Sequence, residues 1–67
     1  MNTRDTEIHT WFERDRQHVE LRDSSTDKTI LEFWDDDVTQ IVEDGFISAR
    51  DWHGSMFEYA QELGLIA

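Results

Sequence analysis

The chain has no cysteine and no proline, and it lacks any long apolar run. Without cysteine it can form neither a disulfide nor a thiolate metal site, which fits a reducing compartment. Without proline it is not a proline-rich linker. No apolar stretch approaches the roughly 18 residues that cross a bilayer. Because the polar residues 1–5 lead into no apolar signal segment, we expect a cytoplasmic protein.

The length of 67 residues predicts one small domain over residues 1–67. A domain of this size buries only roughly 60% of the surface that its unfolded chain exposes, so we expect marginal stability. Its eight aromatic side chains give a large buried area per residue and replace a disulfide or metal staple.

Basic residues are scarce, because six Lys and Arg stand against sixteen Asp and Glu, for a net charge of −10. The imbalance is concentrated after residue 28, where nine acids accompany one base, Arg50. Such a field repels nucleic acid and anionic membranes, and it attracts basic protein surfaces. A second interpretation is that the acids only keep a small domain soluble.

Three segments have the composition of strands. Residues 8–12 and 18–22 are dense in β-branched and aromatic residues that alternate with polar ones, and the polar residues 14–17 separate them as a turn. Five turn-forming residues, 23–27, then lead into a third strand over residues 29–34.

The alternation also predicts which side chains are buried. We expect Val19 and Leu21 to face the core, and Glu20 and Arg22 to face water. The third strand is apolar on both faces, so we expect it to lie centrally or beneath a helix.

The period of the pattern changes after residue 34. The acidic residues 35–37 favour a helix start through capping and first-turn charge. Val38, Ile41 and Val42 follow at the spacing of one helical face. We expect this helix over about residues 36–44, with Gly45 closing it in a left-handed conformation.

A second helix is predicted over about residues 49–63. Gly54 leaves a later start at residue 56 open, because Ser55 and Glu58 match a capping box there. Three strands followed by two helices predict an α+β fold, in which a three-stranded antiparallel sheet carries both short helices on one face.

The acids after residue 28 have the spacing of a nucleic-acid mimic. Helical carboxylates three or four residues apart lie about 5–6 Å from each other, of the same order as the phosphate steps of a nucleic-acid strand. Exposed tryptophans would add apolar anchors to such an interface. We expect Trp34 in the core, and we leave Trp11 and Trp52 open between core and surface. The predicted partner-binding residues are Glu32, Asp35, Asp36, Asp37, Glu43, Asp44, Trp52 and Trp11.

No constellation indicates catalysis. His9, His18 and His53 lack metal-ligand spacing, and we interpret each as a half-buried polar residue. The adjacent acids 35–37 lack the alternate ligand positions of a calcium loop, so we predict no metal site and no cofactor. No nucleophile motif or phosphate-binding glycine loop is present, and we expect a binding protein and not an enzyme. A metal-dependent enzyme built on residues 35–37 and His53 is a third possibility.

Residues 43–47 (EDGFI), 51–55 (DWHGS) and 58–60 (EYA) resemble segments of small acidic proteins carried by phages and mobile elements. In being short, acidic and free of cysteine, the chain is also similar in type to phage-encoded anti-defence proteins. These include anti-CRISPR proteins that act as DNA mimics. The second likeness concerns overall character and transfers no residue roles.

The resemblance and the charge together favour a phage-type inhibitor, acting in the host cytoplasm if a phage encodes it. Its expected partner is a basic, nucleic-acid-binding host defence protein, such as a CRISPR effector or a nuclease, and not nucleic acid or a membrane. The alternative is a small homodimeric accessory or regulatory module that binds through an apolar face, with the acids only providing solubility.

Overall fold

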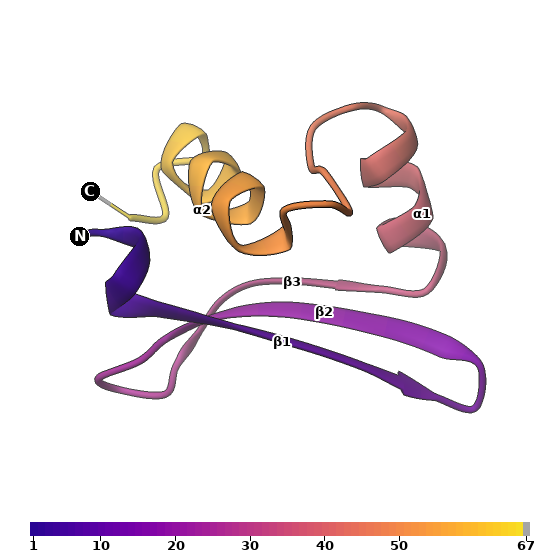
Figure 1. Ribbon diagram of the computed structural model, residues 1–67, viewed down its shortest axis with the longest axis horizontal. Helices are drawn as coiled ribbons and strands as arrows, with labels where there is room; N and C mark the ends of the chain where they lie inside the picture. The colour runs from indigo at the N-terminus through magenta and orange to yellow at the C-terminus, as the bar shows by residue number, and fades with distance from the viewer. Residues whose placement is uncertain (67) are drawn as a thin grey trace.

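The structure, a computed structural model, describes residues 1–66 and consists of one sheet with two helices on one of its faces (Figure 1). In chain order the elements are the 3-10 turn η1 (Thr3–Asp5), the strands β1 (Thr6–Glu13), β2 (Arg16–Asp23) and β3 (Thr29–Trp34), and the helices α1 (Asp36–Glu43) and α2 (Trp52–Glu62). The strands are antiparallel in the order β1-β2-β3. The predicted α+β fold is therefore confirmed. The predicted domain runs to residue 67, which lies outside the described residues.

The first hairpin closes through a two-residue turn at Arg14 and Asp15, whose φ angles are 51° and 64°. Positive φ at both central residues is typical of the type I′ turn, whose twist matches that of the flanking strands. Arg16 and Gln17, which were expected in the turn, therefore belong to β2, and Arg16 pairs with Glu13.

The order of the strands makes β2 central and β3 an edge strand, so β3 does not occupy the central position considered for it. Its Ile30, Leu31 and Phe33 pack against the core beneath the helices, so the other expected position, under a helix, is the one it occupies. The turn before β3 is organised by Asp23, whose Oδ1 accepts hydrogen bonds from Ser25 N at 2.9 Å and Thr26 N at 3.2 Å.

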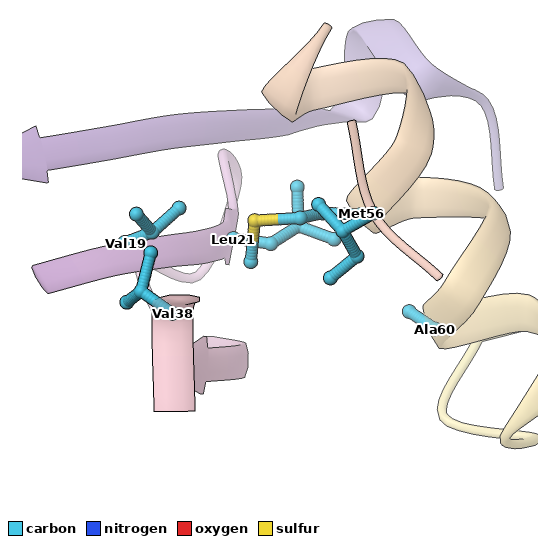
Figure 2. Packing of buried hydrophobic residues seen from close by; sticks show 6 residues of the cluster. Val19, Leu21, Val38, Met56 and Ala60 are labelled. Carbon is cyan, nitrogen blue, oxygen red and sulfur yellow. The ribbon is translucent and has the colours of Figure 1, made fainter. Parts of the chain in front are cut away.

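The core lies between the sheet and the helices (Figure 2). Val19 and Leu21 of β2 point into it, as predicted, and neither has any exposed surface. Val38 of α1 and Met56 and Ala60 of α2 meet them from the other side. Both helices therefore pack against the side chains of β2.

Helix α1 ends as its sequence predicts. Gly45 has a φ of 81°, and its N–H donates to Val42 O at 3.1 Å, while Phe46 N–H donates to Ile41 O at 3.3 Å. This pair of bonds is the Schellman arrangement, which requires a left-handed residue that glycine adopts without strain. The Phe46 ring then lies 5.7 Å from the ring of Tyr59 in α2.

Helix α2 begins at Trp52, later than the predicted residue 49, and it continues through Gly54. Asp51 caps it, since its side chain accepts from Gly54 N at 3.1 Å. A Cβ at Gly54 would overlap Asp51 Oδ2, so this glycine permits the cap. Ser55 is inside the helix and instead accepts from Ser48 N at 3.0 Å. Among residues 1–66, no helix combines the length and apolar character needed to span a membrane.

We predict that Leu21→Ala lowers the free energy of unfolding by about 2–5 kcal/mol, because it deletes a fully buried side chain and leaves a cavity. A chain of this length has a total stability of only about 3–10 kcal/mol, so urea denaturation followed by circular dichroism should show a large loss of folded protein. Leu65→Ala, at a half-exposed position, is the control. Equal losses in the two variants would contradict the assigned core.

Candidate functional site

Four acids of α1 share one solvent-exposed face. Asp36 and Asp37 lie in the first turn, Glu43 and Asp44 lie at the C-terminal end, and all four are exposed. At about 3.6 residues per turn they fall within about 120° of the helix circumference. The last turn contains no base. Since the helix dipole disfavours negative charge at a C-terminus, this end of α1 presents acids that the helix itself does not favour.

Glu32 of β3 extends this acidic face toward the sheet. Glu32, Asp37 and Asp44 border one open depression, with Phe33 and Gln40 between them. Gln40 Nε2 donates to Asp44 Oδ1 at 2.8 Å, which holds the last carboxylate in place. The structure therefore brings three of the six predicted acids around one depression. We call Glu32, Asp36, Asp37, Glu43 and Asp44 the acidic face.

Asp35 differs from the other predicted acids. It occupies the N-cap position of α1 with a φ of 48°, and its side chain makes no capping bond. Its Oδ2 instead accepts from Arg16 Nε at 3.1 Å. Because this base partly neutralises it, we leave Asp35 out of the acidic face.

The three tryptophans lie in two places. Trp52 packs against the core at the start of α2. Trp11 and Trp34 are 37% and 38% exposed, and both lie on the side of the sheet that carries no helix. The expectation that Trp34 is in the core is wrong, because successive strand residues alternate and Phe33 takes the helical side.

His18 is buried between these two tryptophans. Its ring centroid lies 3.8 Å from that of Trp11 in an edge contact and 3.8 Å from that of Trp34 in a tilted stack. The register explains this, because Trp11 and Trp34 are the strand partners of His18 on either side. His18 is only 1% exposed, so the interpretation of this histidine as half-buried is wrong.

Glu20 is also buried on this side of the sheet, although the alternation predicted that it faces water. Its Oε1 accepts from Arg22 Nε and, at 2.7 Å, from Thr29 Oγ1. The hydrogen bond from Arg22 lowers the pKa of Glu20 most, and the bond from Thr29 lowers it further. Glu20 is therefore a buried carboxylate whose charged form is stabilised by its neighbours.

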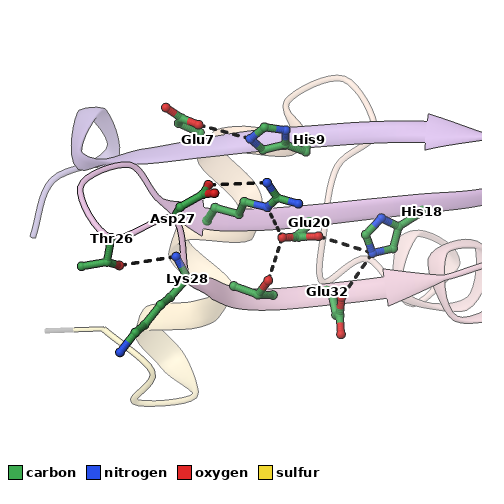
Figure 3. Close-up of polar contacts among 10 residues, drawn as sticks. Glu7, His9, His18, Glu20, Thr26, Asp27, Lys28 and Glu32 are labelled. Atoms are coloured by element: carbon green, nitrogen blue, oxygen red, sulfur yellow. Dashed lines mark hydrogen bonds and ion pairs between the residues drawn. The ribbon is translucent and has the colours of Figure 1, made fainter.

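His18 and Glu20 meet Glu32 on the same surface (Figure 3). His18 Nε2 lies 3.3 Å from Glu32 Oε2 and 3.7 Å from Glu20 Oε2. We call the sheet surface that bears Trp11, His18, Glu20, Glu32 and Trp34 the uncovered face. Among residues 1–66, the group of side chains with converging potential metal-ligand atoms is His18, Glu20 and Glu32.

The uncovered face was not predicted from the sequence, because Glu20, a polar residue that alternates with the apolar Val19 and Leu21, was expected to face water. The register of the first hairpin could have indicated this face. A two-residue turn at residues 14 and 15 places Trp11 opposite His18 and His9 opposite Glu20. The rings of Trp11 and Trp34 and the long side chain of Arg22 can bury the polar side chains between them although no helix covers this face.

His53 has a structural position. Its Nε2 lies 2.7 Å from Thr6 Oγ1, and that hydroxyl donates to Thr3 O at 2.6 Å. His53 Nε2–H is therefore the donor to Thr6, and the bond ties α2 to η1 and β1. This contact gives the alternative enzyme, built on residues 35–37 and His53, no support.

Replacing Thr29 by Val removes a hydroxyl donor to Glu20 and keeps the branched shape. We expect the free energy of unfolding at pH 7 to fall by about 1.5–3 kcal/mol, the range for a hydrogen bond to a charged group. Because the pKa of Glu20 is lowered by folding, its stabilising contribution is present above the ordinary glutamate pKa and is lost as pH falls through the folded value.

The difference between Thr29→Val and the wild type should therefore shrink in acid, as measured by urea denaturation from pH 7 downward. Thr39→Val, at an exposed position of α1, is the matched control. A difference that stays constant with pH, or that the control reproduces, would show that Thr29 does not act through the Glu20 carboxylate.

Comparison of the chain with models of protein families, with curated proteins and with solved structures finds no match.

Proposed function

We propose that this chain is a phage-type inhibitor that binds a nucleic-acid-binding host defence protein through its acidic face. The acidic face would lie in the basic groove that nucleic acid otherwise occupies. The observation that carries the proposal is the row of exposed acids along α1, which has no base in its last turn. A CRISPR effector is the first partner to test, because the chain is similar in type to DNA-mimicking anti-CRISPR proteins.

The spacing of the acids supports this mode of binding. Asp36 and Glu43 are seven residues apart, which is about 10 Å along a helix axis. That distance equals about three phosphate steps of roughly 3.4 Å along a nucleic-acid strand. The two ends of α1 can thus match two phosphate positions, with Glu32 and Asp37 adding charge beside them.

The distribution of charge supports a basic protein as the partner. The chain carries a net charge of −10, and most of the excess follows residue 28. Such a field raises the rate of association with a positively charged groove and repels nucleic acid itself. An inhibitor of this kind gains affinity from the surface that its target uses for DNA or RNA.

The second candidate function is the homodimeric accessory or regulatory module. The half-exposed Trp11 and Trp34 favour it, because large aromatic side chains are common anchors of protein interfaces. Binding through this surface would depend little on ionic strength, whereas binding through the acidic face weakens steeply as salt is added.

We predict that the double substitution Glu43→Lys, Asp44→Lys abolishes partner binding and leaves the domain folded. Lysines at a helix C-terminus are favoured by the dipole, so loss of binding cannot be assigned to an unstable helix. The experiment captures proteins from a host extract on the immobilised domain, elutes them with DNA and identifies them by mass spectrometry.

The matched control is Glu58→Lys, Glu62→Lys, which makes the same change in net charge at exposed positions of α2. The proposal expects the control to retain the DNA-eluted partner and the α1 variant to lose it at least tenfold. Equal recovery on both variants, or a partner that neither DNA nor moderate salt removes, would refute binding through the acidic face.

A further inference from the structure

Three side chains on the uncovered face bring metal-ligand atoms together. His18, Glu20 and Glu32 come from two adjacent strands, and one potential ligand atom from each lies within 4.8 Å of the others. In Figure 3 the imidazole points toward both carboxylates. Tetrahedral Zn²⁺ with bonds of about 2.0–2.2 Å holds its ligand atoms about 3.3–3.6 Å apart. The two distances from His18 Nε2, 3.3 and 3.7 Å, are close to that spacing.

Glu20 is buried and held in a fixed orientation beside His18. The residue is 4% exposed, and its Oε1 already accepts from Arg22 and Thr29. Its other oxygen, Oε2, lies 3.7 Å from His18 Nε2 and is directed at the imidazole. Arg22 and Thr29 meanwhile hold the carboxylate in one orientation, as outer-shell partners of metal ligands do.

The charges of Glu20 and Glu32 also favour a bound cation. Glu20 and Glu32 are direct partners across the β2–β3 ladder. Like charges at opposed strand positions destabilise a sheet. A divalent cation between them would replace this repulsion by two attractions. Glu32 is half-exposed, so an ion can reach the site from solvent.

We propose that His18, Glu20 and Glu32 bind a divalent transition-metal ion of the Zn²⁺ type. One imidazole nitrogen and two carboxylate oxygens suit zinc and its neighbours better than Mg²⁺ or Ca²⁺, which take six or more oxygens.

The second ring nitrogen of His18, Nδ1, determines the metal affinity that we expect. Among residues 1–66, His18 Nδ1 is buried without a hydrogen-bond partner. A metal-bound histidine usually donates its second N–H to an acceptor, and loss of that partner weakens metal binding by about 10- to 100-fold. We therefore expect a site of moderate affinity that strong chelators empty.

The test titrates Zn²⁺ into chelator-treated protein and follows heat, melting temperature and tryptophan emission. Trp11 and Trp34 report on the site because their rings lie 3.8 Å from that of His18. We expect the wild type to gain melting temperature with added Zn²⁺, since the ion binds only the folded state. We expect Glu32→Gln, which preserves shape at a half-exposed position, to bind at least tenfold more weakly.

His9→Gln is the matched control, because His9 Nε2 and Glu7 Oε2 form a separate exposed pair 3.2 Å apart on the same side of the sheet. This variant should bind Zn²⁺ like the wild type. A second measurement needs no variant: Zn²⁺ should shift the NMR signals of the His18 ring and both flanking indoles.

Absence of Zn²⁺ binding by the wild type would overturn the proposal. So would undiminished binding by Glu32→Gln, or a loss confined to His9→Gln. The result is separable from the proposed function, because Glu43→Lys, Asp44→Lys leaves His18, Glu20 and Glu32 in place and should bind Zn²⁺ like the wild type. Glu32→Gln also removes a member of the acidic face, so it tests the metal site alone and is not used to test the proposed function.

Discussion

Both faces of strand β2 are buried, and a different part of the molecule covers each face. On the helical side, Val19 and Leu21 need α1 and α2 above them. On the other side, Trp11 and Trp34 of the adjacent strands flank His18, while Arg22 of β2 and Thr29 of β3 contact Glu20. A chain with no disulfide thus obtains two buried layers from a single sheet, one apolar and one polar. The polar layer is fully buried only where rings and an arginine exclude water.

This arrangement separates stability from charge. The acids of α1 point away from the core, so the sequence can change them without disturbing Val38 or Met56. Glu43 and Asp44 lie at the C-terminal end of α1, where negative charge is unfavourable for the helix, and this is a reason to look for their role in binding. The uncovered face is the opposite case, because its charged groups hold one another in place and any change there acts on the fold as well.

Much of the architecture could be predicted from local patterns. The strand and helix periods, the Gly45 helix end and the inward direction of Val19 and Leu21 each depend on neighbours close in the chain. The burial of His18 and Glu20 could not be read in this way, because it depends on partners from β1 and β3 that only the ladder register brings together. The same holds for Asp35, whose pairing with Arg16 joins residues 19 apart in the chain. The acidic face could be predicted in part. Most of its residues belong to one helix and follow from local spacing, whereas Glu32 comes from β3.

We propose that the acids of α1 occupy the groove in which the partner protein binds nucleic acid. The most direct measurement is the affinity of the captured partner for DNA, determined with increasing amounts of this protein at several salt concentrations. We expect competitive inhibition, in which added protein raises the apparent Kd of the partner for DNA, and an inhibition constant that rises steeply with salt. An unchanged DNA affinity in the presence of bound protein, or inhibition indifferent to salt, would contradict the proposal.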